Sequence, residues 1–252
     1  MIPKILHYIW LGGNPLPEKV VACMETWKKY CPEYEIKRWD ESNLNLDMCK
    51  YARQAYDAKK YAFASDFFRF YVLKEFGGIY LDVDVELLKS LDDLLDQKCF
   101  MGFECYGKQK SVNPGLIAGS EKNGKVVTDM YNNYLKDNFL FKDGTINYET
   151  VCTKTTNYLI ENYQLEINEE VQNLKDVTIY PSEYFCPING ETKVEEFLTE
   201  NTYSRHIYLA SWLPPMTAKT KIKNFIKKVI IALIGKKKFE KIREKRRKRN
   251  GN

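Results

Sequence analysis

Residues 76–86 read Phe76-Gly77-Gly78-Ile79-Tyr80-Leu81-Asp82-Val83-Asp84-Val85-Glu86. Apolar residues alternate with other residues in this run, which is typical of a β-strand, because successive side chains of a strand point to opposite faces. We therefore expect Asp82 and Asp84 to share one face while their apolar neighbours point into the core. Two carboxylates on one face repel each other unless a cation lies between them, and a hard divalent ion prefers such oxygen ligands. Because such an ion commonly completes its coordination with water and substrate phosphate, the stretch predicts an enzyme that handles a phosphorylated donor.

The segments on either side of this stretch predict an α/β fold. Strands are expected at 5–10, 34–39, 100–104, 115–119 and 177–180, and helices at 19–30, 47–56, 58–76 and 123–138. Strands that alternate with helices indicate a sandwich around a mainly parallel sheet. Ligands of such sheets bind at the carboxyl ends of the strands, so Trp10 and Asp84, which both lie near predicted strand ends, are expected to share one cleft.

The helix expected before the Asp-x-Asp stretch contains Ser65-Asp66-Phe67-Phe68-Arg69. Asp66 and Arg69 are three residues apart and therefore share a helix face. A solvated surface ion pair is the simplest interpretation. However, aromatic residues surround the pair nearly all round the helix, which indicates a buried helix, and buried charges need partners. We interpret the pair as lying in a cleft near the cation, where it binds sugar hydroxyls and offsets phosphate charge.

The cysteine pattern argues against a zinc site. The chain of 252 residues has seven cysteines and two histidines, and no two cysteines show the C-x-x-C spacing of zinc sites. We interpret the cysteines as reduced thiols of a cytosolic protein. No secretory signal pattern is visible, and no apolar segment has the length needed to cross a bilayer.

Positive charge is concentrated in the last part of the chain. Residues 219–252 carry 15 Lys and Arg against 2 Asp and Glu, whereas the preceding residues carry 24 basic and 32 acidic side chains. An apolar stripe opposite lysines over 221–234 is typical of a helix in a membrane interface, and the basic run 236–249 would attract anionic lipid. We expect a domain at 1–217 and a basic amphipathic helix and tail at 218–252. The alternatives are a solvated tail and, less favoured because no base-reading motif is present, nucleic-acid binding.

Three ordered motifs resemble a known family. They are Ile2-Pro3-Lys4-Ile5-Leu6-His7-Tyr8-Ile9-Trp10-Leu11-Gly12-Gly13, then Ser65-Asp66-x-x-Arg69, then Gly77-Gly78-Ile79-Tyr80-Leu81-Asp82-x-Asp84. Together they closely resemble the glycosyltransferases of family 32, sugar-transferring proteins with an Asp-x-Asp motif that include capsular polysaccharide synthesis proteins. Yeast α-mannosyltransferases and clostridial glucosylating toxins are more distant relatives. The resemblance implies a GT-A type fold, a nucleoside-diphosphate sugar donor (a UDP-sugar is favoured), Mn²⁺ or Mg²⁺, and retention of anomeric configuration.

The resemblance also implies roles for individual residues. Positions that match donor-binding residues are Ile9, Trp10, Ser65, Tyr80, Asp82, Ser211 and Trp212, and positions that match catalytic residues are Asp66, Arg69 and Asp82. Among them Trp10 would stack on the nucleobase, and Ser211 and Trp212 would close over the diphosphate. Asp84, together with Asp82, would hold the metal.

Three further residues have less certain places in this pattern. Related sequences often carry His-His or Ile-His where this chain has Arg205-His206-Ile207. We interpret His206 as a structural or loop residue rather than a metal ligand. Asn113 and Glu149 could lie near the site, but their spacing does not place them.

The resemblance implies a retaining hexosyltransferase that acts on a hydroxyl of a glycan or lipid-linked glycan in capsular or cell-surface polysaccharide synthesis. With the basic tail, this places the protein in the cytoplasm, peripherally at the inner face of the plasma membrane. No carboxylate is evident as a nucleophile, which favours front-face substitution with the leaving phosphate as base. Two other classes stay open. One is a metal-dependent nucleotidyltransferase, although Leu11-Gly12-Gly13-Asn14 is too slight for the Gly-rich phosphate loop expected near its first strand, and the other is a non-enzymatic calcium- or sugar-binding module.

Overall fold

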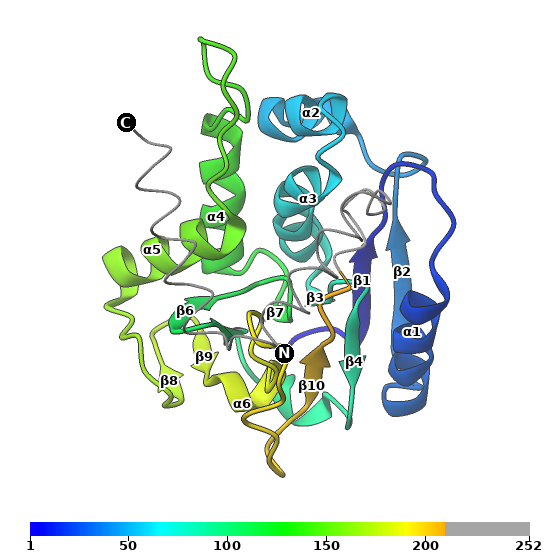
Figure 1. Cartoon of the computed structure of the whole chain (residues 1–252), viewed down its shortest axis with the longest axis vertical. Coiled ribbons are helices and arrows are strands. Elements are labelled where there is room, and N and C mark those ends of the chain that lie inside the picture. The colour runs from blue at the N-terminus through cyan, green and yellow to red at the C-terminus, as the bar shows by residue number, and fades with distance from the viewer. Residues whose placement is uncertain (210–252) are drawn as a thin grey trace, which may run out of the picture. The chain divides into compact units, whose positions relative to one another are not determined.

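The structure, a computed structural model, describes residues 1–209 of the chain (Figure 1). The strands of the central sheet are β1 (Ile5–Ile9), β2 (Glu35–Trp39), β3 (Gly78–Tyr80), β5 (Cys99–Tyr106), β6 (Gln109–Val112), β7 (Ala118–Ser120), β8 (Gln172–Asn173) and β9 (Thr178–Tyr180). A second, two-stranded sheet pairs β4 (Val85–Leu87) with β10 (Ser204–His206). The helices are α1 (Glu18–Tyr30), α2 (Lys50–Asp57), α3 (Tyr61–Phe76), α4 (Lys125–Lys136), α5 (Val151–Tyr163) and α6 (Ser182–Phe185), with short 3-10 helices at Leu46–Met48 and Asp92–Leu94.

The central sheet has the strand order β2-β1-β3-β7-β5-β9-β8, and β6 pairs with β5. β1 is parallel to β2 and β3, β7 is antiparallel to both of its neighbours, and β9 is parallel to β5. Strands β1, β2, β3, β5 and β9 therefore run in one direction. This confirms the predicted α/β fold around a mainly parallel sheet, whose carboxyl strand ends are the expected place for a ligand.

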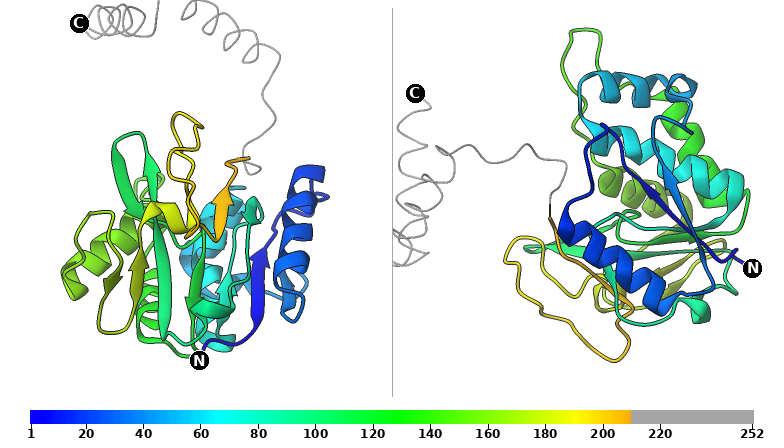
Figure 2. Two further views of the ribbon diagram at one scale, coloured as in Figure 1. Left: turned by 90° about the horizontal axis from the view of Figure 1, so that it is seen from below. Right: turned by 90° about the vertical axis from the view of Figure 1, so that its right-hand side faces the viewer.

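Two apolar cores flank the central sheet, and the ribbon views show helices on both of its sides (Figure 2). One core contains the apolar residues of α2, α3, α4 and α5, including the fully buried Phe67, Phe68 and Phe70. The other contains those of α1 and α6, including Trp27 and Phe185. Helix α3 contacts α2, α4 and β1, which explains why it is apolar on nearly every side.

Gly77 and Gly78 end α3 and begin β3. Both have a positive φ, of 66° and 102° respectively, in the region that residues with a side chain rarely adopt. A Cβ on Gly78 would also lie only 2.7 Å from the carbonyl oxygen of Ile5 on β1. The two glycines let the chain turn directly from a buried helix into a buried strand.

The two aspartates of the Asp-x-Asp stretch lie in a turn, so the strand alternation expected for residues 79–85 is wrong. β3 ends at Tyr80, and a hydrogen bond from Val85 N to Asp82 O (3.1 Å) closes the turn before β4. β4 then leaves the central sheet to pair with β10. Asp82 and Asp84 therefore do not share a strand face, and each is positioned by its own partners.

The predicted tail and the expected domain boundary at residue 217 lie outside the described residues. Within residues 1–209, no helix combines the length and the apolar character that crossing a bilayer requires.

His7 is a buried histidine that ties β1 to its surroundings. Its Nε2 donates to Gly77 O (2.7 Å), and its Nδ1 accepts from Trp39 Nε1 (3.0 Å). Because the indole N–H can only donate, these contacts define the tautomer of a neutral imidazole. Burial lowers the pKa of His7 to about 4, although the Gly77 carbonyl opposes that shift.

We expect His7 to make the protein less stable in mild acid. As the pH falls from 6.5 to about 4, the unfolded chain binds a proton at His7 that the native protein does not, so the free energy of unfolding decreases. The full loss corresponds to about 3 kcal/mol. The measurement is urea unfolding at neutral pH and at about pH 4 for the wild type and His7→Gln, whose side chain keeps a donor but does not titrate. The variant should show the smaller loss on acidification; an equal loss in both proteins would contradict the assignment.

Candidate functional site

Helix α3 contributes a buried ion pair to the site. Asp66 Oδ1 lies 2.9 Å from Arg69 Nη2, and Asp82 Oδ1 lies 3.6 Å from the same nitrogen. The side chains of Asp66 and Arg69 are 9% and 4% exposed, whereas that of Asp82 is 29% exposed. Asp66 and Arg69 are therefore not a solvated surface pair. Solvent reaches this group of three side chains mainly at Asp82.

The guanidinium of Arg69 lies against the ring of Tyr80, and some of its N–H donors are not used within the described residues. Its guanidinium carbon is 4.9 Å from the centre of the Tyr80 ring, and the Tyr80 hydroxyl donates to Asp82 Oδ1 (2.8 Å). Nε and Nη1 of Arg69 are buried and have no hydrogen-bond partner in the described part of the chain. Because unpaired buried donors are costly, Arg69 is well suited to bind an anionic or hydroxyl-bearing ligand.

The loop that follows β6 covers the same residues. Asp82 N donates to Gly115 O (2.8 Å), and Gly115 N donates to Asn113 Oδ1 (2.7 Å). A Cβ on Gly115 would collide with Asp82 Oδ2 and lie 2.6 Å from Arg69 Nη1. A glycine at this position therefore lets the backbone approach both side chains closely.

Asp84 does not share the partners of Asp82. Its own partners lie in residues 206–209, at the end of the described part of the chain. Its Oδ1 lies 3.0 Å from His206 Nε2, and its Oδ2 accepts from Leu209 N (2.8 Å). Its carbonyl oxygen accepts from Ile207 N (3.0 Å). The antiparallel register of β4 and β10 pairs His206 with Val85. This pairing brings together an aspartate and a histidine that are 122 residues apart.

The contact between Asp84 and His206 shifts the pKa of each partner. Burial alone would raise the pKa of Asp84, but the charge and hydrogen bond of His206 and the Leu209 N–H outweigh it and hold the pKa below 3.8. Burial alone would lower the pKa of His206, but Asp84 outweighs it and raises that pKa above 6.5. Each partner therefore stabilises the charged form of the other.

The carboxyl groups of Asp66 and Asp82 are harder to ionise. Burial raises the pKa of Asp66 to about 7, although Arg69 opposes the shift. Burial also raises the pKa of Asp82, against the effect of Arg69, and the negative charge of Asp84 adds to the rise. Asp82 and Asp84 are therefore close enough to repel each other, and a bound cation would relieve this repulsion.

The donors around Asp84 fit a divalent cation. Asp84 supplies a carboxylate, and Mg²⁺ or Mn²⁺ commonly needs only one or two carboxylates when substrate phosphate completes the coordination. His206 would join as a ligand only in its neutral form, so metal binding there would displace the proton that Asp84 favours. Across residues 1–209, however, no three Asp, Glu, His or Cys side chains form a ready metal cluster. The carboxylates of Asp82 and Asp84 were expected to bind one cation together. In the structure they have different partners, so a metal site formed by both is not present in advance.

The other predicted donor-binding residues are placed less centrally. Ile9 is buried at the end of β1, and the half-buried Trp10 follows it, with Nε1 donating to Asn14 O (2.6 Å). Ser65 donates to Ala62 O within α3 (2.7 Å). Ser211 and Trp212 lie outside the described residues, so their roles stay predictions.

His206, Asn113 and Gly115 are the residues that sequence reasoning underrated. His206, which we interpreted as a structural or loop residue, lies on β10 rather than in a loop, and its contact with Asp84 agrees with a structural role. The run Val112-Asn113-Pro114-Gly115 lies between the strands expected at 100–104 and 115–119, and its Asn-Pro-Gly sequence was a turn signal that could have drawn attention to the loop. No local signal marks His206, because its place depends on strand pairing. Glu149, the other residue that could lie near the site, forms an ion pair with Lys154 (3.0 Å).

Ligands of open α/β sheets bind at the carboxyl ends of the strands, where the structure groups these acidic and basic side chains. Comparison with known proteins shows what the chain is similar to. Residues 17–101 match the family described as the glycosyltransferase sugar-binding region containing DXD motif. This match includes Asp66, Arg69, Asp82 and Asp84.

Two curated relatives and one solved structure agree with this match. Glycosyltransferase L373 of Acanthamoeba polyphaga mimivirus is 28% identical over 224 residues, which cover 85% of each chain. Inositol phosphoceramide mannosyltransferase 3 of Schizosaccharomyces pombe is 38% identical over 98 residues, which cover 37% of this chain but only 27% of the yeast protein. The structure of the PaToxG glycosyltransferase aligns with a TM-score of 0.50 and 21% identity, over 64% of this chain and 69% of that one.

These similarities confirm the resemblance to glycosyltransferases with an Asp-x-Asp motif. Residues 17–101 match the model of the DXD sugar-binding region, and the fold is the GT-A type of α/β sandwich.

Proposed function

We propose that this protein is a retaining glycosyltransferase of family 32. It moves a hexosyl group from a nucleoside-diphosphate sugar, with a UDP-sugar favoured, to a hydroxyl of a glycan or lipid-linked glycan. The observation that carries the proposal is the adjacency of two groups: a buried Asp66–Arg69 pair with Asp82, and the Asp84–His206 pair next to it. The first group suits sugar hydroxyls and the second suits a divalent cation with its diphosphate.

The side chains of the first group would position the donor sugar. Asp66 and Asp82 would accept hydrogen bonds from its hydroxyls and orient the anomeric carbon. Arg69 has two nitrogens without a partner among residues 1–209 and lies next to Asp82 through its third, Nη2. It would add positive charge near the departing phosphate. Mn²⁺ or Mg²⁺ held at Asp84, with His206 beside it in its neutral form, would supply a Lewis acid.

The transfer would follow a front-face path. In this path the acceptor oxygen forms its bond to the anomeric carbon on the side from which the phosphate oxygen leaves. The bond to that oxygen breaks with its electron pair, and the departing phosphate takes the acceptor proton. The anomeric carbon is oxocarbenium-like in between, as in other glycosyl chemistry.

A donor screen tests the proposed reaction. UDP- and GDP-hexoses are incubated with the protein and Mn²⁺, with and without EDTA, and release of nucleoside diphosphate is measured. We expect at least one donor to be hydrolysed slowly to nucleoside diphosphate and free sugar, and EDTA to stop the reaction. Release of pyrophosphate from a nucleoside triphosphate and a sugar phosphate would indicate a nucleotidyltransferase instead, and calcium binding without turnover of any donor would indicate a binding module.

We also propose a place for the reaction in capsular or cell-surface polysaccharide synthesis, at the cytoplasmic face of the membrane. The support is the composition of residues 219–252, with 15 basic and 2 acidic side chains, and the name of the S. pombe relative, which is a mannosyltransferase of a ceramide lipid. A lipid-linked acceptor would be presented at such a surface.

The membrane proposal predicts a difference between two lengths of the chain. The full chain should pellet with vesicles that contain phosphatidylglycerol, and a chain that ends at residue 217 should stay in solution. Each basic residue near an anionic surface contributes roughly 1 kcal/mol, so partitioning should change by at least tenfold and should weaken with salt. Vesicles of phosphatidylcholine alone are the control. Equal pelleting of both chain lengths would remove the proposal.

A further inference from the structure

Glu104 on β5 is a half-buried carboxylate beside the candidate site. Its Oε2 accepts from Asn113 Nδ2 (2.9 Å) and from the Tyr208 hydroxyl (3.4 Å), and its Oε1 lies 3.5 Å from Cys152 Sγ. Within residues 1–209, no ion pair involves Glu104, in contrast to carboxylates nearby. Within these residues its direct partners are neutral hydrogen-bond donors, which leave part of its acceptor capacity for a ligand.

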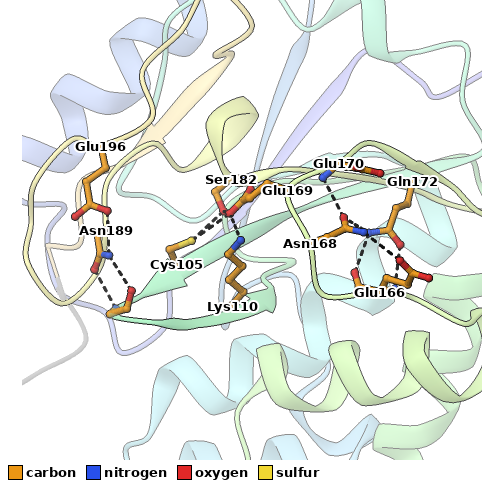
Figure 3. A network of polar contacts seen from close by, with 11 residues as sticks. Cys105, Lys110, Glu166, Asn168, Glu169, Glu170, Gln172, Ser182, Asn189 and Glu196 are labelled. Atoms are coloured by element: carbon orange, nitrogen blue, oxygen red, sulfur yellow. Dashed lines mark hydrogen bonds and ion pairs between the residues drawn. The ribbon is translucent and has the colours of Figure 1, made fainter.

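The other face of the β5–β6 hairpin shows a carboxylate that is fully neutralised within the protein (Figure 3). Cys105 follows Glu104 on β5, so its side chain points to the opposite face of the hairpin from that of Glu104. In the register of the two strands, Cys105 lies opposite Lys110 of β6. On that face Glu169 lies 2.7 Å from Lys110 Nζ and accepts from Ser182 N (2.9 Å). Glu169 thus has a structural set of partners, including a cation, that Glu104 lacks.

On one side, Glu104 is connected to the part of the site that would hold the donor sugar. The amide of Asn113 donates to Glu104 through Nδ2 and accepts from Gly115 N through Oδ1. Gly115 in turn lies against Asp82 and against Nη1 of Arg69. That nitrogen is buried and has no partner among the described residues, which independently indicates that a ligand binds next to Asn113 and Gly115.

On the other side, Glu104 is connected to the part that would hold the diphosphate. The hydroxyl of Tyr208 is near Glu104, and the Tyr208 ring lies 4.2 Å from the ring of His206, which contacts Asp84. Lys193 Nζ lies 3.7 Å from the centre of the same Tyr208 ring. Glu104 therefore lies between the two groups of the site.

The strand order indicates which substrate Glu104 faces. Trp10 follows β1, Asp82 follows β3, and Glu104 lies on β5, which is separated from β3 by β7. A donor that extends from Trp10 to Asp82 would place its nucleobase near β1 and its sugar near β3. The part of the site next to β5 would then be open to the acceptor.

We propose that Glu104 binds the acceptor, which is a sugar or another polyol, by accepting a hydrogen bond from one of its hydroxyls. This proposal rests on the transferase function proposed above. An ionised carboxylate has about four acceptor positions, so the contacts with Asn113 and Tyr208 leave room for a ligand hydroxyl. Asn113 is a positioning residue that holds the carboxylate in place.

Glu104→Gln separates this role from donor binding. The donor found in the screen is hydrolysed with water as acceptor, and its transfer is measured to glycerol and to methyl α- and β-pyranosides of glucose, galactose, mannose and N-acetylglucosamine. We expect hydrolysis to stay within about threefold of the wild-type rate, and transfer to the best of these acceptors to fall by about 10- to 100-fold, mainly through a higher acceptor KM. Glu104→Asp, which keeps the charge, should recover part of the transfer.

Glu169→Gln is the matched control, because it also removes a carboxylate next to the same hairpin. It should leave the ratio of transfer to hydrolysis unchanged even if its melting temperature is lower. The proposal is overturned if Glu104→Gln lowers hydrolysis and transfer equally, if it leaves transfer unchanged, or if the wild type hydrolyses the donor but transfers to none of these polyols. Absence of donor hydrolysis in the wild type would instead count against the proposed function.

Discussion

Replacing Asp84 with asparagine is expected to lower metal-dependent turnover of the sugar donor by about a thousandfold. The asparagine side chain has nearly the same shape, and its amide oxygen can still accept the hydrogen bond that Leu209 N now donates to Asp84 Oδ2. The negative charge that stabilises the His206 imidazolium and would hold the cation is lost. Turnover is measured as nucleoside diphosphate released at increasing Mn²⁺, together with the melting temperature.

Asp92→Asn is the matched control for this prediction. Asp92 is 51% exposed and pairs with Lys4 at 3.1 Å, so its replacement removes one carboxylate outside the site. We expect this variant to turn over donor at the wild-type rate. A folded Asp84→Asn protein with unchanged turnover and unchanged Mn²⁺ dependence would eliminate Asp84 as the residue that holds the cation.

Replacing Gly115 with alanine is expected to lower donor turnover by about 100-fold, because the added methyl group must displace a reacting-site side chain by about 1 Å. That methyl would collide with Asp82 Oδ2 and lie 2.6 Å from Arg69 Nη1. Arg69 is buried and cannot move freely, so we expect Asp82 to rotate away and lose its contacts with Tyr80 and Arg69. Such overpacking also costs roughly 1–3 kcal/mol of stability.

Gly144→Ala separates the loss of turnover from the loss of stability. Gly144 has a φ of 82°, with no atom within 4 Å of an added Cβ, so its replacement strains the backbone by about 1 kcal/mol without touching the site. We expect this control to melt at a lower temperature but to keep wild-type turnover. If the two alanine variants lose turnover in parallel with stability, Gly115 has no special role at the site.

The parts of the site that lie within one helix or next to it could be predicted from the sequence. Aromatic residues on nearly every side of α3 indicated burial, and the three-residue spacing of Asp66 and Arg69 placed both on one face, where the structure has them 2.9 Å apart. Helix periodicity is a local property, and burial of a charge pair follows from the residues around it. The Gly77-Gly78 break was visible for the same reason.

The strand expected across residues 79–85 was wrong because alternation does not reveal where a strand ends. Apolar residues at 79, 81, 83 and 85 suit one continuous strand, and they are equally compatible with two short strands joined by a turn. β3 joins the central sheet and β4 pairs with β10, so the turn at Asp82 and Asp84 results from pairing with two different sheets. These partners are far away in the chain, and local patterns do not specify them.

The sequence by itself determined the α/β class, the buried acid–base pair on α3 and the Gly77-Gly78 break before the two aspartates, because each depends on local patterns of residue type. Only the tertiary structure decided that His206 meets Asp84, that Gly115 lies against Asp82 and Arg69, and that Glu104 lies between the two groups. These contacts arise when the strands assemble, and the pairing of strands depends on long-range packing that short-range periodicity does not encode.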